Sequence, residues 1–337
     1  MRSGSWQRLA ASVGAIAIAG TLAVQAQAQT VLRFSHTDTA TGARQKAAEL
    51  FAKQVEEGTQ GRYKVQVFHS GQLANDPKAI EQLQLGGVDF TVSGTGSYAP
   101  HVKTLNLTAL PYLVDGYAQG WKLYDESKWL QAQFDLLPAK GLRILATWEA
   151  GFRSFTTKEP LGSPADAKGK KMRVFPNDMI RWIMESIGFT PVVLPVTEVY
   201  LAIQQGTVIG QENPIDTINS LRFYEVAPYI TLTQHVYSPI PLAVSERTWQ
   251  KLSQADQAAI VRAAQAAAKF SREEVRANDQ RLLDEMTAKG AKVSRPDIAA
   301  FRKAASSVYE KARGTYGADV DAILADTEAV RKALPSN

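Results

Sequence analysis

Cysteine is absent from the 337 residues, so the chain can form neither a disulfide framework nor a thiolate metal site. Histidine is scarce, and the H-x-x-x-H and H-E-x-x-H spacings typical of zinc sites are missing from the four that occur, which are His36, His69, His101 and His235. The G-x-S-x-G motif, which presents the nucleophilic serine of many hydrolases, is missing too. We therefore expect no metal and no cofactor.

A strong excess of one charge is also missing. The 38 Lys and Arg residues stand against 33 Asp and Glu, a formal net charge of +5 at pH 7. This charge is too small to indicate binding to nucleic acid or to an anionic membrane. The length and the 45% hydrophobic content are ordinary for a soluble protein and favour two domains. We expect the partner to be a small molecule or another protein.

One long apolar run occurs, at residues 9–24, after Arg2 and Arg8. It is shorter than the roughly 20 residues that a membrane span needs. Small residues follow it and end at Ala28, which fits the A-x-A cleavage rule. The pattern predicts that residues 1–28 are a cleavable signal peptide of an exported protein. Their removal takes away two positive charges and lowers the net charge from +5 to +3.

Residues 30–94 follow the order strand, helix, strand, helix, strand. Strands are expected at residues 30–36, 63–68 and 88–94, with helices capped by Thr41 and Asp76, the second having Pro77 in its first turn and Gly86 at its end. The same order recurs at residues 171–210, with strands at 171–175, 190–195 and 207–210 and helices at 177–188 and 197–206. Such alternation predicts parallel strand pairing in two separate bodies.

Two extended segments, residues 143–151 and 235–246, are expected to carry the chain from one body to the other and back. A helix of about 50 Å is predicted near residues 258–290, long enough to brace both bodies, and two amphipathic helices follow it. The predicted fold class is α/β, with two lobes and a long bracing helix. The expected domains are lobe I at 29–150 plus 239–270, lobe II at 151–238, and the bracing and C-terminal helices at 271–337.

Arg173 stands in "KKMRVF", a stretch otherwise built like a buried strand, where a charge costs free energy unless it is paired. Arg153 opens the strand "GFRSFTT", and Asn213 is expected to follow a strand in "GQENP". Two guanidinium groups and a carboxamide at strand ends suit a carboxylate ligand. The alternative is a structural ion pair of Arg173 with Asp178 or Glu198.

The segment "SGTGSYAP", residues 93–100, contains a G-x-G-x-x-A arrangement after a strand. No apolar-periodic helix follows it, so a dinucleotide site is not indicated. A tight loop that approaches a ligand with Ser93, Thr95 and Ser97 as donors is one interpretation, and a plain turn is the other. Four aromatic residues near the crossings are candidates for a pocket wall or for the core, namely Trp148, Phe152, Phe175 and Tyr237.

Several segments from about residue 31 to about residue 290 resemble one family. They include "LRFSHT", "GQLANDPKAIEQLQLGGVDF", "KGKKMRV" and "TEVYLAIQQGTVIGQENP". They are similar to the solute-binding subunits of tripartite ATP-independent periplasmic (TRAP) transporters, dicarboxylate-binding type. The resemblance implies a two-lobed periplasmic protein that closes on an organic acid, is not an enzyme, and delivers the acid to integral membrane subunits.

The same resemblance implies that Arg173, Arg153 and Asn213 face the ligand. Thr37 and Asp76, in two of the matched segments, are further candidate contacts. Two departures from the family pattern leave the ligand open. Ile209 replaces an acid before "GQENP", and the bulky pair Phe175 and Pro176 would shape the pocket for a larger or aromatic acid.

Two rival functions remain. The first is a periplasmic hydrolase or isomerase of organic acids, for which His36 or Asp76 would have to act as general base. The second is the binding subunit of an ATP-driven importer, which the "GQENP" segment disfavours.

Overall fold

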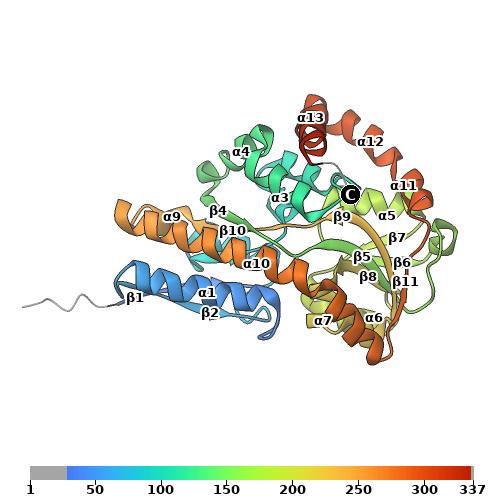
Figure 1. Ribbon diagram of the computed structural model, residues 1–337, viewed down its shortest axis with the longest axis horizontal. Helices are drawn as coiled ribbons and strands as arrows, with labels where there is room; N and C mark the ends of the chain where they lie inside the picture. Colours follow the sequence, from blue (N-terminus) through green and yellow to red (C-terminus); the bar gives the residue numbers. More distant parts are fainter. Residues whose placement is uncertain (1–28, 335–337) are drawn as a thin grey trace, which may run out of the picture.

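The computed structural model describes residues 29–334 (Figure 1), so the predicted signal peptide, residues 1–28, lies outside the described residues. Its first sheet has the order β2-β1-β3-β10-β4. The strands are β1 (Thr30–Ser35), β2 (Tyr63–Phe68), β3 (Phe90–Val92), β4 (Leu142–Trp148) and β10 (Ile240–Ser245). The first three pair in parallel, as predicted, and β10 lies antiparallel between β3 and β4.

The second sheet has the order β11-β9-β5-β8-β6-β7. Its strands are β5 (Phe152–Thr157), β6 (Lys171–Val174), β7 (Thr190–Val193), β8 (Gly210–Pro214), β9 (Tyr229–Tyr237) and β11 (Lys292–Ser294). The parallel pairing of β6 with β7 and β8 is as predicted, and β5 runs antiparallel to β8 and β9. We call the first sheet with its helices lobe I and the second lobe II.

The strand predicted at residues 207–210 was placed too early. The amides of Thr207 and Val208 bond to the carbonyl of Ala202 and close the preceding helix, so β8 begins only at Gly210. Asn213 therefore lies inside β8 and does not follow it.

The two predicted crossings between the lobes are confirmed, since β4 leads into β5 and β9 into β10. Glu149, fully buried at the first crossing, holds the segments together. Its carboxylate accepts hydrogen bonds from Trp121 Nε1 at 2.7 Å, the Tyr237 hydroxyl at 2.7 Å, and the amides of Ala150 and Gly151 at 3.0 and 2.7 Å. Burial nevertheless raises the pKa of this carboxyl. The crossing is thus fixed by one acid that joins three parts of the chain.

The predicted long helix is confirmed as α10 (Gln254–Ala288), whose 35 residues span about 50 Å. Ser253 caps its N-terminus, because the Ser253 side chain accepts a hydrogen bond from the amide of Asp256. In lobe I it packs against α1 (Ala43–Gly58) and β4, and in lobe II against α7 (Ile215–Ser220) and β11. Figure 1 shows it running past both lobes, with α1 alongside.

The remaining helices cover the two sheets. In lobe I they are α2 (Asp76–Leu85), α3 (Tyr117–Glu126), α4 (Lys128–Phe134) and α9 (Glu246–Trp249), with the 3₁₀ helices η1 (Thr95–Tyr98), η2 (Lys103–Ala109) and η3 (Pro138–Lys140). In lobe II they are α5 (Asp178–Ile187), α6 (Val199–Gln204), α8 (Phe223–Val226), η4 (Pro164–Ala167) and η5 (Val196–Glu198). The C-terminal α11 (Ile298–Ala305), α12 (Ser307–Tyr316) and α13 (Ala318–Ala333) pack on α3, α4 and α5.

The N-cap positions of two helices differ from prediction by one residue. Asn75, and not Asp76, caps α2, because Asn75 Oδ1 accepts a hydrogen bond of 3.1 Å from the amide of Lys78. Thr41 does not cap α1, which begins after Gly42 without a side-chain cap. The predicted end of α2 is confirmed, since Gly86 adopts the left-handed conformation with φ 78°.

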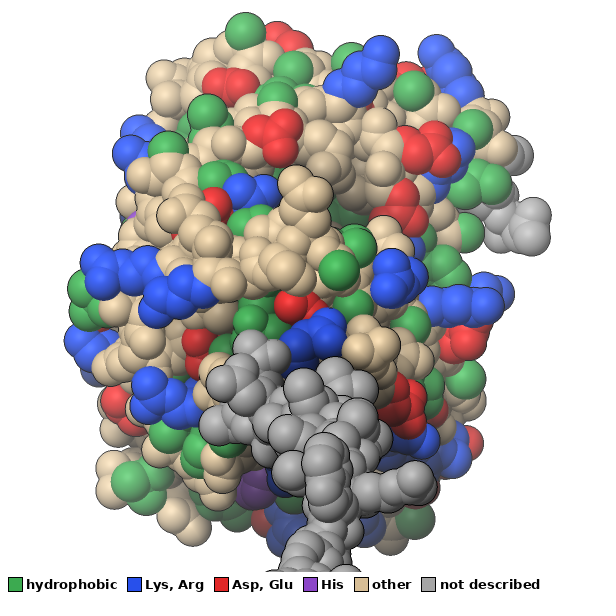
Figure 2. Space-filling view, turned by 90° about the vertical axis from the view of Figure 1, so that its left-hand side faces the viewer, with side chains coloured by type: hydrophobic (Ala, Val, Ile, Leu, Met, Phe, Trp, Pro, Cys, Tyr) green, Lys and Arg blue, Asp and Glu red, His purple; other side chains and the backbone are tan. Residues whose placement is uncertain are grey.

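The outer surface carries both charges. Figure 2 shows Lys and Arg side chains interspersed with Asp and Glu over the face at the β1 and α9 end of the molecule. Within residues 29–334, no helix has the length and apolarity needed to cross a membrane.

Candidate functional site

A cavity of about 70 Å³ lies between the lobes. Lobe I contributes loop residues and the starts of α1 and α2, and lobe II contributes strand ends. The polar side chains on its wall are Thr37, Asp38, Arg44, Asp76, Ser97, Arg153, Arg173, Asn213, Thr217 and Ser238. The apolar wall includes Ala150, Phe175, Val196, Leu221, Ile240 and four prolines.

Arg173, in β6, is 2% exposed. Its Nε donates to the carbonyl of Leu194 at 2.9 Å. Over residues 29–334, no carboxylate lies within 4 Å of Arg173, and its two terminal nitrogens have no hydrogen bond. The alternative pair with Asp178 is wrong, because Asp178 bonds to Arg181 at 3.2 Å. The pair with Glu198 is not formed either.

Burial lowers the pKa of Arg173 to about 10, although Glu212 and Asp76 act to raise it. The side chain therefore stays protonated at neutral pH. A buried cation without a paired anion is costly, and it binds an anion strongly if one enters the cavity.

Arg153, by contrast, already has a partner. Its Nη2 donates to Glu212 Oε1 at 2.8 Å, its Nε donates to Glu212 Oε2, and its Nη1 donates to Ser238 at 3.2 Å. His235 Nε2 lies 3.3 Å from Glu212 Oε2. Burial acts to raise the pKa of Glu212, but Arg153 and His235 outweigh it and hold that pKa at about 2. The charge of Arg153 is thus compensated before any ligand arrives.

Phe175 and Asn213 complete the lobe II wall. The guanidinium carbon of Arg153 lies 4.9 Å from the centre of the Phe175 ring, so the ring covers this ion pair. The side-chain amide of Asn213 donates to Gln211, its neighbour on the same face of β8. Both residues line the cavity as the sequence led us to expect.

On the lobe I wall, Asp76 binds two hydroxyls through the same oxygen. Its Oδ1 accepts from Thr37 at 3.1 Å and from Ser93 at 3.2 Å. Arg44 Nη1 donates to the Thr37 hydroxyl at 3.2 Å. Thr37 and Asp76 line the cavity, whereas Ser93 supports Asp76 from behind.

The two lobes also touch through α7. The Ser220 hydroxyl donates to Asp38 Oδ1, and the amide of Ala43 donates to Asp216 Oδ1 at 3.4 Å. Burial, and then the carboxylate of Asp38, raise the pKa of Asp216 to about 7. Carboxylates from both lobes thus meet beside the cavity.

Three other predicted residues do not line this cavity. Trp148 is fully buried in the lobe I core, where its Nε1 donates to the carbonyl of Ala264 at 3.3 Å. Thr95 donates to the carbonyl of Pro239 at 3.3 Å, and Tyr237 donates to Glu149. These contacts fix the loop and the crossings.

Sequence reasoning missed Glu212, Arg44 and Asp38. Glu212 precedes Asn213 in "GQENP", and its side chain is on the other face of a strand that was not predicted there. Arg44 lies in α1 and Asp38 lies before it. Because this helix carries many polar residues, hydrophobic periodicity did not distinguish either residue as functional.

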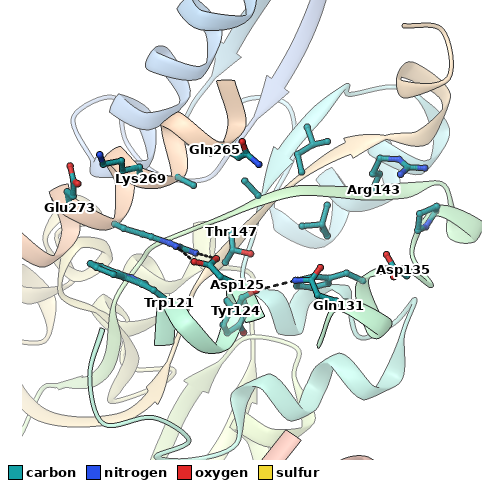
Figure 3. Close-up of a pocket in the computed structure, with 17 residues that line it drawn as sticks. Trp121, Tyr124, Asp125, Gln131, Asp135, Arg143, Thr147, Gln265, Lys269 and Glu273 are labelled. Carbon is teal, nitrogen blue, oxygen red and sulfur yellow. Dashed lines mark hydrogen bonds and ion pairs between the residues drawn. The ribbon is translucent and has the colours of Figure 1, made fainter. Parts of the chain in front are cut away.

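A larger cavity of about 630 Å³ lies among α3, α4, β4 and α10 and shares no lining residue with the first (Figure 3). Its two arginines are already paired. Arg272 forms two bonds of 2.7 Å with Asp125, and Arg143 bonds to Glu246 at 2.8 and 2.9 Å. It offers an anion no free guanidinium, so we place the candidate site in the smaller cavity.

Few groups that could perform catalysis lie at this cavity. In the described part of the chain, no cluster of three His, Cys, Asp or Glu side chains could hold a metal ion. Of the two candidate bases, His36 lies off the cavity wall with its Nε2 2.8 Å from Gln45 Oε1. Asp76 lines the cavity, but its Oδ1 already accepts from two hydroxyls. Burial lowers the pKa of His36 to about 3. The geometry favours binding of an anion.

Comparison with known proteins gives a consistent result. Residues 34–315 match the family described as bacterial extracellular solute-binding protein, family 7. The sialic acid-binding periplasmic protein SiaP of Vibrio cholerae is 30% identical over 304 residues, 90% of this chain and 94% of that protein. The C4-dicarboxylate-binding periplasmic protein DctP of Rhodobacter capsulatus is 32% identical over 248 residues, 72% of this chain and 74% of that protein.

A solved structure shares the fold over nearly its whole length. It is a TRAP periplasmic solute-binding protein from Polaromonas bound to D-erythronate, with a TM-score of 0.84 and 34% identity. The match covers 88% of this chain and 99% of that one.

Proposed function

This chain belongs to family 7 of the bacterial extracellular solute-binding proteins, and we propose that it holds the carboxylate of an organic acid on Arg173, in the cavity between its lobes. It is a TRAP-type solute-binding protein, and it acts by binding and not by chemistry. The predicted α/β two-lobed fold with a bracing helix is confirmed. Its partners are a small organic acid and the membrane subunits of the transporter.

The observation that carries the proposal is the unpaired state of Arg173. Its guanidinium is buried, protonated, and free at both terminal nitrogens among residues 29–334. A carboxylate accepts two parallel hydrogen bonds from such a fork. Arg153, Asn213 and Phe175 would then shape the rest of the lobe II wall, and Thr37 and Asp76 the lobe I wall.

The binding cycle follows from where these groups lie. In an open form the acid would meet Arg173 on lobe II, and rotation about the crossings would bring Asp76 and Thr37 over it. Closure would be driven by contacts that only the closed form makes. The membrane subunits would then recognise and bind the closed form of the protein.

The proposal also covers where the protein is located in the cell and which class of acid it binds. Relatives are periplasmic, which supports export of this chain to the periplasm through a signal peptide at residues 1–28. Relatives bind several kinds of acid, among them D-erythronate and succinate. The sequence leaves open whether the acid is a dicarboxylate, a keto acid or an aromatic acid. A dicarboxylate would place one carboxylate on Arg173, and Arg44 on the lobe I wall is a second cation in the same cavity.

Replacing Arg173 tests the proposal. Arg173→Met keeps most of the side-chain volume and removes the charge. Loss of a buried charge partner costs roughly 2–5 kcal/mol, which weakens binding by about 30-fold to several thousand-fold. Isothermal titration calorimetry against mono-, di-, keto- and aromatic carboxylates measures this loss.

The melting temperature without ligand gives an independent readout. Since Arg173 has no paired anion, Arg173→Met should melt at the same temperature as the parent or higher, whereas breaking a structural ion pair would lower it. Arg181→Met, at an exposed and paired arginine on α5, is the control and should leave binding unchanged. Binding by Arg173→Met within threefold of the parent would refute the assignment.

A further inference from the structure

The glycine-rich loop at residues 93–100, for which the sequence left a ligand-approaching loop and a plain turn as alternatives, lies where the two lobes meet. Gly96, in η1 of lobe I, lies opposite Asn177 of lobe II. A Cβ at Gly96 would lie 2.2 Å from Asn177 Nδ2, closer than two such atoms can approach. Gly96 does not have a positive φ, so glycine is not needed here for the backbone conformation. Its missing side chain leaves room for lobe II.

Asn177 is held in this position by bonds within lobe II and by bonds to lobe I. Its Oδ1 accepts a hydrogen bond of 3.1 Å from the amide of Ile180 and so caps α5. Its Nδ2 donates to Asn106 Oδ1 at 2.8 Å and to the Gly96 carbonyl at 3.5 Å. A side chain at Gly96 would therefore either displace this helix cap or keep the lobes apart.

Asn106, in η2 of lobe I, makes its side-chain hydrogen bonds with the opposite lobe. Its Oδ1 accepts from Asn177 Nδ2 and from the amide of Asp178 at 3.3 Å, and its Nδ2 donates to the Tyr316 hydroxyl at 3.0 Å. Tyr316 belongs to α12, which packs on α5 of lobe II. Asn106 and Asn177 are 5% and 6% exposed, so water does not compete for these bonds while the lobes are together. The bonds are present only when α5 lies against η2.

We infer that Gly96, Asn106 and Asn177 form a latch that stabilises the closed form of the protein, and that they set how tightly the acid is retained without contacting it. None of the three lines the interlobe cavity. Phe175 and Pro176, which directly precede Asn177, do line it, so the latch positions that part of the cavity wall. The inference rests on the proposed function and adds three positioning residues to it.

The latch should affect every ligand alike. An acid that binds only the closed form has an apparent affinity that scales with the fraction of the protein able to close. A latch variant should therefore weaken the binding of all acids by one common factor and leave their order of affinity unchanged. A residue that contacts the ligand would instead change the affinities of different acids by different factors.

Isothermal titration calorimetry of residues 29–337 tests the latch with D-erythronate, succinate and the carboxylates used for Arg173. Gly96→Ala adds one methyl group at the contact, and Asn106→Leu keeps the side-chain size and removes the three bonds. Each should weaken every acid that the parent binds by about tenfold or more, with factors that agree within about threefold. Gly116→Ala, where a Cβ meets nothing within 4 Å, is the matched control in lobe I and should bind as the parent does.

The distance between the lobes is a second readout. The chain has no cysteine, so Leu85→Cys on α2 and Leu201→Cys on α6, both at exposed positions, allow two spin labels to be attached without background. At the acid concentration that saturates the parent, the parent should show one closed distance. Gly96→Ala and Asn106→Leu should show a remaining open fraction that more acid removes. Without acid, the melting temperature of Gly96→Ala should stay within about 2 °C of the parent, because the open form has no clash.

The outcomes are distinct. Affinities of both variants within about threefold of the parent would overturn the latch and leave the proposed function standing, provided that Arg173→Met loses binding. A changed order of affinity among the acids would show that these residues contact the ligand, and an open fraction that excess acid does not remove would show a merely structural role; either result would overturn the inference. If one variant fails to fold, the other decides. Binding of no acid by the parent would overturn the proposed function and the latch with it.

Discussion

Glu212→Gln is the substitution whose effect the structure defines most sharply. Glu212 is completely buried, and its ion-pair partner Arg153 is 5% exposed. The change keeps the shape and one acceptor oxygen of the side chain but removes its charge. Arg153 would then join Arg173 as a second buried cation without an anion, while Ser238 and the carbonyl of Glu212 remain as its neutral partners.

Breaking one partner of a buried ion pair costs about 3–5 kcal/mol. For a chain of this size, 1 kcal/mol shifts the melting temperature by about 2 °C, so Glu212→Gln should melt roughly 6–10 °C below the parent. The low pKa of Glu212, about 2, sets the pH window. Its stabilisation is present above the ordinary value of 4.5 and is lost as the pH falls toward 2. The loss should therefore be fully visible at neutral pH.

Differential scanning calorimetry at neutral pH measures this loss. Asp125→Asn is the control, because it breaks an equally well aligned pair with Arg272 in which the acid is 53% exposed. Exposed pairs contribute at most about 1 kcal/mol. A bound carboxylate should restore more stability to Glu212→Gln than to the parent, since it supplies the missing anion. A drop no larger than that of the control would refute the view that Glu212 neutralises Arg153.

Three more predictions concern stability. Burial raises the pKa of Asp216 from 3.8 to about 7, so between these two pH values the folded protein binds more protons at this residue than the unfolded chain does, and stability falls as the pH rises toward 7. Asp216→Asn should then raise the unfolding free energy by more than about 1 kcal/mol at about pH 8 and leave it unchanged near pH 4; an equal effect at both would contradict the protonation. A Cβ at Gly210 would lie 2.1 Å from the Thr156 carbonyl oxygen, so Gly210→Ala should cost more than about 2 kcal/mol, measured by urea unfolding. Gly314→Ala, in the open on α12, should instead stabilise by about 0.5–1 kcal/mol, and a loss there would count against the helix.

Much of the fold was readable because local signals agree with tertiary structure. The parallel pairing in both sheets, the two crossings and α10 all follow from periodicity and length. The errors in predicted helix caps and strand starts occur where one local hydrogen bond forms in place of another. Asn75 takes the cap expected of Asp76, which is used by Thr37 and Ser93, and the turn after α6 delays β8.

The site was readable in part for a similar reason. Arg173 could be found because a charge inside an apolar strand conflicts with its surroundings, and the structure shows no pair that removes the conflict among residues 29–334. Glu212 could not be found, because its pairing with Arg153 depends on strands β5 and β8 lying side by side, 59 residues apart in the sequence. Asp38, on the lobe I wall, was missed because a polar residue in a loop gives no sign in the sequence that it is buried.

The two crossings have a consequence for how the protein can be divided. Lobe I is not completed until β10, residues 240–245, inserts between β3 and β4, and by then nearly all of lobe II has been synthesised. Lobe II in turn needs β11, which follows the long helix. No single cut yields a fragment that contains one whole sheet and none of the other. The two halves of the interlobe cavity are therefore made and inherited as one unit, and neither can be exchanged with a relative by simple fusion at a single point.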